Sequence, residues 1–292
     1  MNAVTAGGAP GGLVFRDMTP EDVPAVLRLC RLAGWNQRTE DWQPLLANGF
    51  FRVAVRDATV VGSGGAVVYG RRLAWVAMIL VDPDARRQGI ATRLMRDALA
   101  RLKAVEVVGL EATPQGAPVY GGLGFTDRGG FARMERPADA EPVRAEQGPT
   151  VPRPLTAPDL VGLAARDGAV FGADRSAVLA WARAQAPEYA WSTGAREEPA
   201  GYVLGRHGHR TEHLGPLVAD DEETAARLLT AILAAVPGRA FTIDIPDRPA
   251  WRERIRILGF REQRPFRRMI LGDAPSPGDP RQRFAILGPE FG

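Results

Sequence analysis

The stretch from Met78 to Leu94, MILVDPDARRQGIATRL, decides how this chain is interpreted. It predicts an apolar strand that ends at Val81, a turn at Asp82-Pro83, and an amphipathic helix that begins near Gly89. A loop that enters a helix presents free backbone N–H groups and the positive end of the helix dipole. The stretch therefore predicts an anion site of the kind that holds a pyrophosphate.

Side chains of the same loop fit this prediction. Gly89 and Ala91 would let phosphates come close to the backbone, and Arg86 and Arg87 would add charge-assisted contacts. Taken alone, the pattern Arg-x-x-Gly-x-Ala fits equally well a plain strand–helix turn with exposed arginines. Its interpretation depends on what surrounds it.

An internal repeat organises the rest of the chain. The pattern Arg-x-x-Thr-x-x-Asp starts at Arg16 and again at Arg153, 137 residues later. Leu80-Val81 recurs as Leu217-Val218 at the same offset. The pair Gly-Phe, followed by Phe-x-Arg-Met, occurs at Gly124 and at Gly259, 135 residues later. Three anchors in one order indicate two homologous domains. We assign residues 13–136 and 151–272 to them, with a tail at 1–12, a Pro/Ala/Glu-rich linker at 137–150 and a C-terminal tail at 273–292.

Each repeat alternates strands and helices. In the first, periodicity and capping residues predict helices after Thr19 and over 39–46, 89–102 and 117–123, and strands over 51–56, 62–69, 74–81, 105–112 and 131–135. The second repeat has strands near Tyr202, Leu214 and Phe241 and helices near Thr224 and Trp251. This order predicts an α/β fold (α+β by some schemes): two tandem domains, each with a mixed, mostly antiparallel central sheet flanked by helices.

Composition excludes several classes of function. Of the 292 residues, 45% are apolar and 24% charged, which is ordinary for a soluble globular protein. No apolar run is long enough to span a membrane, so we expect no membrane contact. The net charge of +3 is spread among acids without a basic run, which argues against nucleic acid as a partner. The single cysteine, Cys30, precludes an intrachain disulfide and fits a reducing cytoplasm.

A second motif downstream makes the pattern specific. The loop follows Val81-x-Pro83, and Tyr120-x-x-x-Gly124-Phe125 lies on the short helix after the next strand. Together these motifs resemble the GNAT superfamily of N-acetyltransferases, in a tandem layout with a divergent second half. The resemblance implies a first repeat that binds acetyl-CoA through the strand end and the loop, at Ile79, Leu80, Val81, Arg86, Arg87, Gln88, Gly89, Ile90, Ala91 and Thr92.

The resemblance also implies a mechanism. An amine attacks the thioester directly in a ternary complex, a strand N–H near Leu80 stabilises the oxyanion, and Tyr120 protonates the departing thiolate. A phenol with an ordinary pKa of about 10 is protonated at neutral pH and can serve as this acid. The alternative is that Tyr120 only packs its helix against the core.

The proton acceptor and the acceptor-binding residues are less defined. Glu111, on the strand before Pro114, is the first candidate for a general base, although it is equally an ordinary paired glutamate. Asp41 and Glu40 are further candidates, and a chain of waters could also serve. The segment between the first two helices often lines the acceptor site in the family, so we expect Trp35, Asn36, Asp41 and Trp42 there. The tryptophans could instead belong to the core.

The second repeat has lost these features. After Leu217-Val218 its loop is three residues shorter, has no glycine and carries four acids at positions 220–223, which would repel a pyrophosphate. Ile255 stands at the position of Tyr120. We therefore expect the second repeat to pair with the first and to wall the acceptor cleft, without binding CoA.

The three histidines, His207, His209 and His213, lie close together but lack a cysteine or an ordered acid cluster beside them. We expect a polar hairpin there and no metal. The predicted function is transfer of an acetyl group to a small-molecule amine. A non-catalytic acyl-CoA sensor and a protein or peptide acetyltransferase remain the alternatives. Two fused repeats favour a monomer with an internal pseudo-dimer.

Overall fold

A computed structural model describes residues 12–145 and 151–292, so the predicted N-terminal tail and the end of the linker lie largely outside it. The helices are α1 (Val23–Leu32), α2 (Trp42–Ala47), α3 (Ile90–Arg101), α4 (Ala117–Gly121), α5 (Asp159–Phe171), α6 (Ser176–Gln185), α7 (Glu222–Ala235) and α8 (Pro249–Ile257). The strands are β1 (Val14–Asp17), β2 (Gly49–Arg56), β3 (Thr59–Tyr69), β4 (Leu73–Val81), β5 (Val107–Ala112), β6 (Phe125–Arg136), β7 (Arg153–Pro154), β8 (Trp191–Gly194), β9 (Pro199–Arg206), β10 (Glu212–Ala219), β11 (Phe241–Pro246), β12 (Arg261–Leu271) and β13 (Arg283–Ala285).

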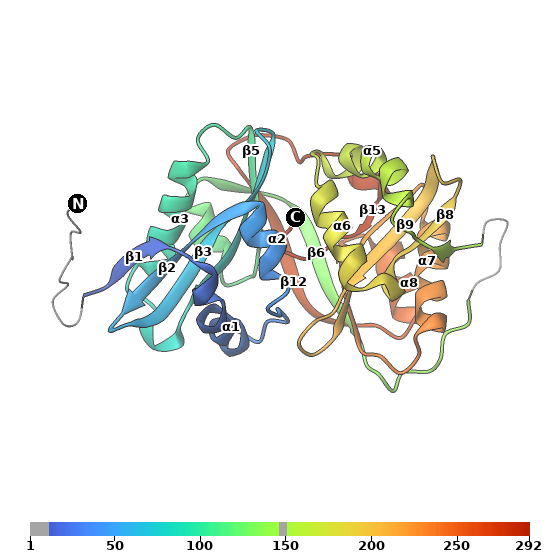
Figure 1. The fold of residues 1–292 in the computed structure, drawn as a ribbon, viewed down its shortest axis with the longest axis horizontal. Helices are drawn as coiled ribbons and strands as arrows, with labels where there is room; N and C mark the ends of the chain where they lie inside the picture. The colour runs from blue at the N-terminus through green and yellow to red at the C-terminus, as the bar shows by residue number, and fades with distance from the viewer. Residues whose placement is uncertain (1–11, 146–150) are drawn as a thin grey trace. The chain divides into compact units, whose positions relative to one another are not determined.

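The chain forms two compact units that do not coincide with the two repeats. Among the described residues, the first unit comprises 12–66 and 78–103, and the second comprises 67–77, 104–145 and 151–292. Strands β3 and β4 therefore contribute residues to both units. Within the first unit the strands follow the order β1-β2-β3-β4 (Figure 1). Helices α1, α2 and α3 belong to the same unit.

The start of each repeat is stabilised by the same contacts among an arginine, a threonine and an aspartate, which we call the clasp. Arg16 donates two hydrogen bonds to the carboxylate of Asp22, at 2.6 and 2.7 Å, and the Thr19 N–H donates to the same carboxylate. In the second repeat Arg153 and Thr156 hold Asp159 in the same way. These contacts give the repeated Arg-x-x-Thr-x-x-Asp pattern its physical basis, because each residue type has a defined partner in the clasp.

In the second unit the two repeats exchange their last long strand. Strand β5 of the first repeat pairs with β12 of the second, β12 pairs with β6 of the first, and β6 pairs with β11 of the second. Figure 1 shows β6 and β12 side by side along much of their length. Because β12 stands between β5 and β6, the second unit takes β5, α4 and β6 out of the first repeat. This exchange explains why compact units and repeats have different boundaries.

Two reciprocal ion pairs link each exchanged strand to a strand of the other repeat. Arg268 of β12 binds Glu111 of β5, with N–O distances of 2.8 and 2.6 Å. Arg133 of β6 binds Asp244 of β11, at 2.8 and 2.7 Å. Each arginine also lies over a phenylalanine of the opposite repeat, Arg268 over Phe131 and Arg133 over Phe266. All four charged side chains are at most 8% exposed. Each of them therefore depends on its partner to compensate its buried charge.

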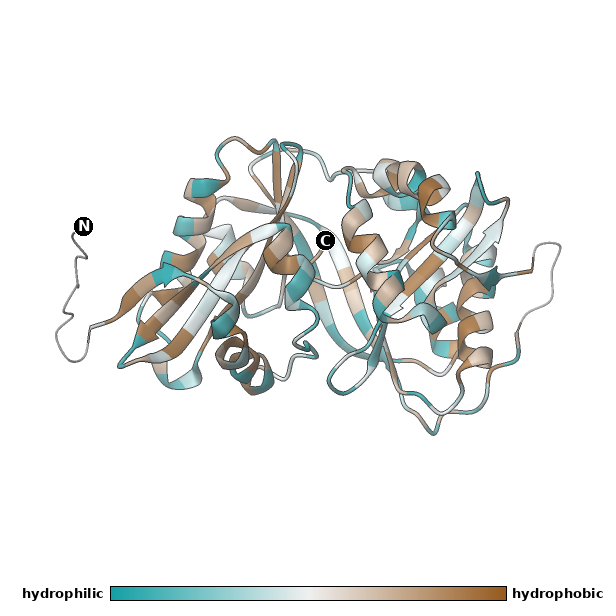
Figure 2. Ribbon diagram, viewed as in Figure 1, coloured by the Kyte–Doolittle hydropathy of each residue, from teal (hydrophilic) through white to brown (hydrophobic). Residues whose placement is uncertain are grey.

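The helices contribute the apolar cores. In the second unit α7 and α8 pack with β10 and β11 in a cluster that includes Leu228, Ile232, Trp251 and Ile243. In the first unit Ile90 and Leu94 of α3 pack with Ala54 and Val61. Helices of both units carry apolar segments beside polar ones (Figure 2), as expected for helices with one face against a sheet.

The C-terminal segment is an ordered part of the second unit. The Tyr69 hydroxyl donates to the carbonyl of Phe291 at 2.8 Å, and Trp75 Nε1 donates to that of Pro289 at 3.1 Å. Arg206 forms a buried ion pair with Glu290 at 2.6 Å. Residues 284–288 are buried, and so are residues 290–292. The segment therefore ties strands of the second repeat to the parts of β3 and β4 that lie in this unit.

Candidate active site

The predicted phosphate loop is held at its base by an ion pair that the sequence does not reveal. Arg28 of α1 donates to the Asp82 carboxylate at 2.7 Å and to the carbonyl of Val60 at 2.9 Å. The Asp82 N–H donates to the carbonyl of Val61 at 2.9 Å. The hydrogen bond from Arg28 lowers the pKa of Asp82, which keeps this carboxylate ionised. The turn is thus fixed to β3 and α1 just where β4 ends.

Gly89 sets the entry into α3. Its φ of 75° places it in the left-handed region, and no atom lies within 4 Å of the position that a Cβ would take. It is the N-cap of α3 and brings no side chain to the helix start. The first bond of the helix runs from Arg93 N–H to the Gly89 carbonyl, so the N–H groups of Ile90, Ala91 and Thr92 lack helical acceptors.

The surface of the loop suits an anion. Arg86, Arg87, Gln88 and Gly89 are all exposed. Arg87 has a φ of 62°, a conformation that costs free energy for a residue with a side chain and that clusters at functional sites. Free amides, two guanidinium groups and the absence of a Cβ at Gly89 together fit the diphosphate of a coenzyme.

Strand β4 becomes irregular just before Ile79, Leu80 and Val81, the strand-end residues predicted to bind acetyl-CoA. Met78 has a φ of 58°, and its carbonyl accepts a hydrogen bond from the Ser63 hydroxyl at 2.9 Å. A Cβ on Gly62 would lie 2.8 Å from Cγ2 of Ile90 and 3.2 Å from the Leu80 carbonyl. The glycine therefore lets α3 and the end of β4 lie close to β3. The parallel ladder between β4 and β5 consists of three pairs, from Leu73–Val107 to Trp75–Gly109.

Tyr120 lies in the last turn of α4, in the second unit. Its ring is half-buried and meets the ring of Phe125 edge-on, with 6.3 Å between centroids. A Cβ on Gly116 would lie 2.9 Å from this ring, so Gly116 provides the space that the ring uses. Burial raises the pKa of Tyr120 to about 12, which keeps the hydroxyl protonated over the physiological range.

Glu111 is enclosed where β5 pairs with the exchanged strand β12. Its Oε1 accepts both hydrogen bonds from Arg268, whereas its buried Oε2 has no hydrogen-bond partner. Burial raises the pKa of this carboxyl, and the nearby guanidinium groups of Arg268 and Arg283 act in the opposite direction. Its counterpart in the second repeat, Asp244, uses both oxygens to bind Arg133. The pairing gives Glu111 a structural role, and the free oxygen leaves it able to accept a proton.

The residues predicted to line the acceptor site belong to the first unit. Trp42 is buried and packs edge-on against Phe51, with 5.3 Å between ring centroids, so it is a core residue. Asp41 is buried and accepts a hydrogen bond from the N–H of Arg38 at 2.8 Å. Asn36 is buried, and Trp35 is half-buried beside it in the chain. Their part in binding an acceptor stays a prediction.

The second repeat caps its corresponding helix with its own carboxylate. Asp221 is the N-cap of α7, and its side chain accepts a hydrogen bond from the N–H of Thr224 at 2.7 Å. Glu222 and Glu223 follow in the first turn, where they favour the helix but repel an added anion. Ile255, at the position of Tyr120, is fully buried in the core.

Two of the three histidines, His207 and His213, are engaged in contacts within the protein. His207 lies 2.7 Å from the Glu212 carboxylate, and His213 is buried with Nε2 3.3 Å from the Ile286 carbonyl. Burial lowers the pKa of His213 to about 4. Over residues 12–145 and 151–292, no group of three or more histidine, cysteine or acidic side chains could hold a metal ion.

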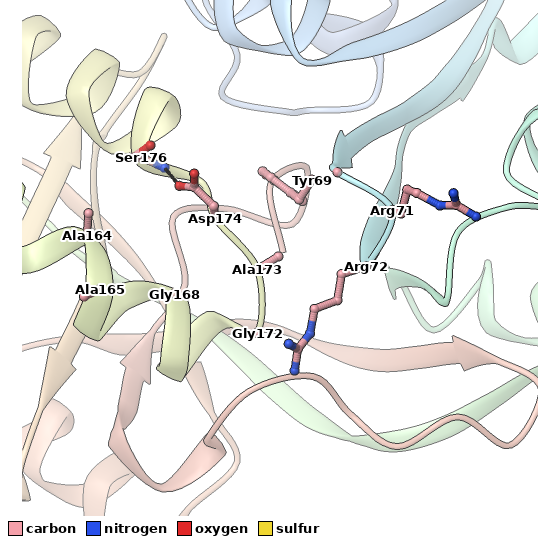
Figure 3. A pocket seen from close by; sticks show the side chains of 11 residues that line it. Tyr69, Arg71, Arg72, Ala164, Ala165, Gly168, Gly172, Ala173, Asp174 and Ser176 are labelled. Atoms are coloured by element: carbon pink, nitrogen blue, oxygen red, sulfur yellow. Dashed lines mark hydrogen bonds between the residues drawn. The ribbon is translucent and has the colours of Figure 1, made fainter.

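A separate hollow of about 540 Å³ lies in the second unit, between the β3–β4 turn and the ends of α5 and α6. Its lining includes Arg71, Arg72, Gly172 and Asp174. Figure 3 shows that the two arginine side chains point in different directions and that Asp174 bonds with Ser176. The hollow therefore lacks converging charges for one ligand.

Comparison with known proteins identifies the class. The sequence profile of the acetyltransferase (GNAT) family matches residues 21–125, and that of an acetyltransferase (GNAT) domain matches residues 164–285. The chain belongs to the GNAT acetyltransferases, with two GNAT domains in tandem, and it is an acyltransferase. The family in general transfers acetyl groups from acetyl-CoA to nitrogen.

Individual relatives agree with this assignment. The chain is 27% identical over 237 residues to YitH of Bacillus subtilis, described as an uncharacterized N-acetyltransferase, covering 78% of this chain and 80% of YitH. It shares its fold with a proposed acetyltransferase from Pyrococcus horikoshii, at a TM-score of 0.78, 21% identity and full coverage of both chains. A tandem GNAT protein of the clavulanic acid biosynthesis pathway has a TM-score of 0.60 at 18% identity, covering 90% of this chain and 100% of that one.

The helices of the described segments include none with the length and apolar character that crossing a bilayer requires.

Proposed function

We propose that the first repeat transfers an acetyl group from acetyl-CoA to a primary amine of a small molecule, by direct attack in a ternary complex. The observation that carries this proposal is the contrast between two helix starts. Gly89 leaves the start of α3 without a side-chain cap, whereas Asp221 occupies that of α7 with a carboxylate. Only the first can offer its amides to a diphosphate.

The bound coenzyme would extend from this loop along the end of β4. Backbone groups of Ile79, Leu80 and Val81 would pair with the pantetheine arm, and the Leu80 N–H would face the thioester oxygen. One preorganised donor of this kind contributes about 3–4 kcal/mol of transition-state stabilisation.

The acetyl group passes directly from the thioester to the amine, without an acyl-enzyme intermediate. The amine nitrogen attacks the thioester carbonyl carbon, a C–N bond forms, and the C–S bond breaks as the tetrahedral intermediate collapses. Tyr120 donates its proton to the departing thiolate, which its raised pKa permits at neutral pH. The amine gives a proton to a base and the tyrosinate recovers one from solvent.

The base that we favour is Glu111, because its Oε2 is buried without a hydrogen-bond partner. Asp41 already accepts a hydrogen bond from Arg38, and Glu40 is exposed and forms an ion pair with Arg38 at 3.2 Å. Water remains the alternative acceptor of the proton. Trp35, Asn36 and Asp41 remain the proposed neighbours of the amine, whereas Trp42 is a core residue. A protein or peptide acceptor and a non-catalytic sensor are the competing proposals.

Release of free thiol from acetyl-CoA, measured with a panel of small amines and peptides, tests the proposal. We expect turnover with a small amine, and a fall in kcat of about a hundredfold in Tyr120→Phe with little change in CoA affinity. Tyr69→Phe is the matched control, because Tyr69 bonds to the Phe291 carbonyl and has no proposed role in the reaction. Binding of CoA without turnover on any amine would favour the sensor, and an unchanged rate in Tyr120→Phe would remove the proposed acid.

A further inference from the structure

In the second repeat, two parallel strands stop pairing part-way along their length. We call the place where this pairing ends the β10–β11 wedge. Strands β10 and β11 form three pairs, from Glu212–Phe241 to Leu214–Ile243. Directly after this ladder, Gly215 has a φ of 147°, and the pairing of β10 with β9 shifts register between Leu214 and Leu217. Gly215 lies 137 residues after Met78, the left-handed residue of β4, so both repeats are irregular at one aligned position.

The end of the chain fills this wedge. Strand β13 pairs antiparallel with β10, with Leu217 opposite Ala285 and Val218 opposite Arg283. The next residue, Ile286, bridges to β11, where its N–H donates to the Asp244 carbonyl at 3.0 Å. One short segment thus contacts both strands of the wedge. Leu217 and Val218 are the residues that align with Leu80 and Val81 of the first repeat.

Side chains around the segment form hydrogen bonds and packing contacts with it. Trp251 Nε1 donates to the Phe284 carbonyl at 2.9 Å, and the two rings meet edge-on at 5.1 Å. The Arg283 guanidinium donates to the carbonyls of Val170 and Pro277, at 2.9 and 3.2 Å. Ile286 packs against Phe131 and Phe266. Residues 283–287 are all buried, which distinguishes the segment from a loosely attached tail.

We infer that the β10–β11 wedge is a docking slot for an extended peptide, and that the chain's own segment Arg283–Ile286 occupies the place where the second repeat would otherwise hold the arm of an acyl-CoA. The comparison with the arm rests on the proposed function of the first repeat. A β-strand and a pantetheine arm both present amide N–H and C=O groups to a strand edge, so one edge can pair with either. The second repeat thus excludes coenzyme twice, by its acidic helix start and by this strand.

The contacts in the slot favour a particular residue type at each position of the docked segment. It takes an aromatic residue at 284 against Trp251, a small residue at 285 beside Leu217, and an aliphatic residue at 286 against two phenylalanines. The residues beyond it continue to Tyr69 and Trp75, so the docked strand also fixes the last turn of the chain.

Amide hydrogen exchange on the full-length protein, with and without coenzyme A, tests the inference. We expect peptides that cover residues 284–286 to exchange at least about a thousandfold more slowly than unstructured chain, with no change at saturating CoA. Exchange near the unstructured rate would overturn the inference, and so would faster exchange when CoA is added. A titration that gives one CoA per chain agrees with it, and two per chain would contradict it.

A substitution separates the slot from general packing. Ile286→Asp places a carboxylate in the buried cluster with Phe131 and Phe266, whereas the matched Ile257→Asp changes a residue that is 74% exposed on α8. We expect a fall in Tm of several degrees for the first variant alone, and recovery on addition of a synthetic peptide of residues 280–292 but not of its Ile286→Asp form. Equal effects of the two peptides would refute the slot. If Ile286→Asp does not fold, exchange in the wild-type protein decides.

These outcomes are independent of the proposed activity. If coenzyme A produced no binding heat in calorimetry and no change in hydrogen exchange anywhere in the first repeat, the proposed function of that repeat would be wrong. Slow exchange at residues 284–286 and the selective peptide effect would still establish the slot.

Discussion

At the scale of single residues, the two repeats differ most at one helix start. Gly89 adopts a left-handed conformation with open space where a side chain would begin, and Asp221 fills the equivalent place with a carboxylate that bonds to Thr224. Both helix starts leave backbone N–H groups without helical acceptors, so we expect the identity of the N-cap residue to decide whether an external anion can bind them.

The pH dependence of turnover follows from the pKa values of Tyr120 and Glu111. Burial raises the pKa of Tyr120 to about 12, so the acid stays protonated and wild-type kcat should show no alkaline decline below about pH 11 from this group. The pKa of Glu111 is also raised, so if it is the base, activity appears only above that raised value and falls as pH is lowered. A profile of kcat against pH checks this, with Glu111→Gln expected to remove the acid limb. An acid limb unchanged in Glu111→Gln would assign the proton to another acceptor.

Local spacing predicted the turn after β4 and the short helix that carries Tyr120, because the residues that form each element are neighbours in sequence. The roles of this loop and of Tyr120 in the reaction stay predictions. The partner of Glu111 could not be predicted in this way. Arg268 is 157 residues away, and neither residue has a local signal that distinguishes an ion pair from an exposed charge. The same holds for Arg28, whose contact with Asp82 spans 54 residues.

At the scale of elements, β3 depends on its glycines to seat α3. Gly62→Val would place side-chain atoms against Ile90, the first residue of the helix, and against the Leu80 carbonyl. We expect a loss of about 1–3 kcal/mol in the free energy of unfolding, together with weaker CoA binding, because the helix start would move. Denaturant unfolding and calorimetry measure the two effects. Gly121→Ala, which meets no atom within 4 Å, is the control and should leave both nearly unchanged.

The exchanged strands depend on their ion pairs. Arg268→Gln would leave the Glu111 carboxylate buried without a countercharge, at a cost of about 3–5 kcal/mol. The neighbouring Arg267 is 57% exposed, so Arg267→Gln should cost less than about 1 kcal/mol. Chemical denaturation distinguishes them, and equal stability of the two variants would disprove the structural role of the buried pair.

Alternation and caps predicted most helices and strands of the first repeat within a few residues. The irregularity of β4 was not predicted, because a left-handed methionine has no signature in sequence. Strand β13 was also missed: three residues between a Pro/Gly-rich loop and the chain end carry too little periodicity to distinguish a strand from a tail.

At the scale of the whole molecule, the exchange of β6 and β12 makes the repeats interdependent. A fragment of residues 1–136 would expose the edges of β5 and β6 that β12 otherwise pairs, and exposed edges promote aggregation. We expect this fragment alone to be insoluble or unfolded, and co-expression with residues 137–292 to recover a complex. Size-exclusion chromatography and circular dichroism measure the result. A folded, monomeric fragment would show that the exchange is dispensable.

The repeat itself was visible in sequence, but the exchange was not. Swapping equivalent strands between homologous domains leaves each strand's own pattern unchanged and alters only its partners. Sequence reasoning therefore predicted the fold of each domain and assigned the boundaries as if each kept its own last strand.

The most direct test of the account is calorimetric titration of the full-length protein with coenzyme A, comparing wild type, Gly89→Glu and Gly70→Glu. Gly70 is the matched control, since its φ of 63° and the open space around it resemble those of Gly89. We predict one site in the wild type, an affinity at least about a hundredfold weaker in Gly89→Glu, equivalent to about 2.7 kcal/mol, and no loss in Gly70→Glu. Absence of binding to the wild type, or undiminished affinity in Gly89→Glu, would contradict the account.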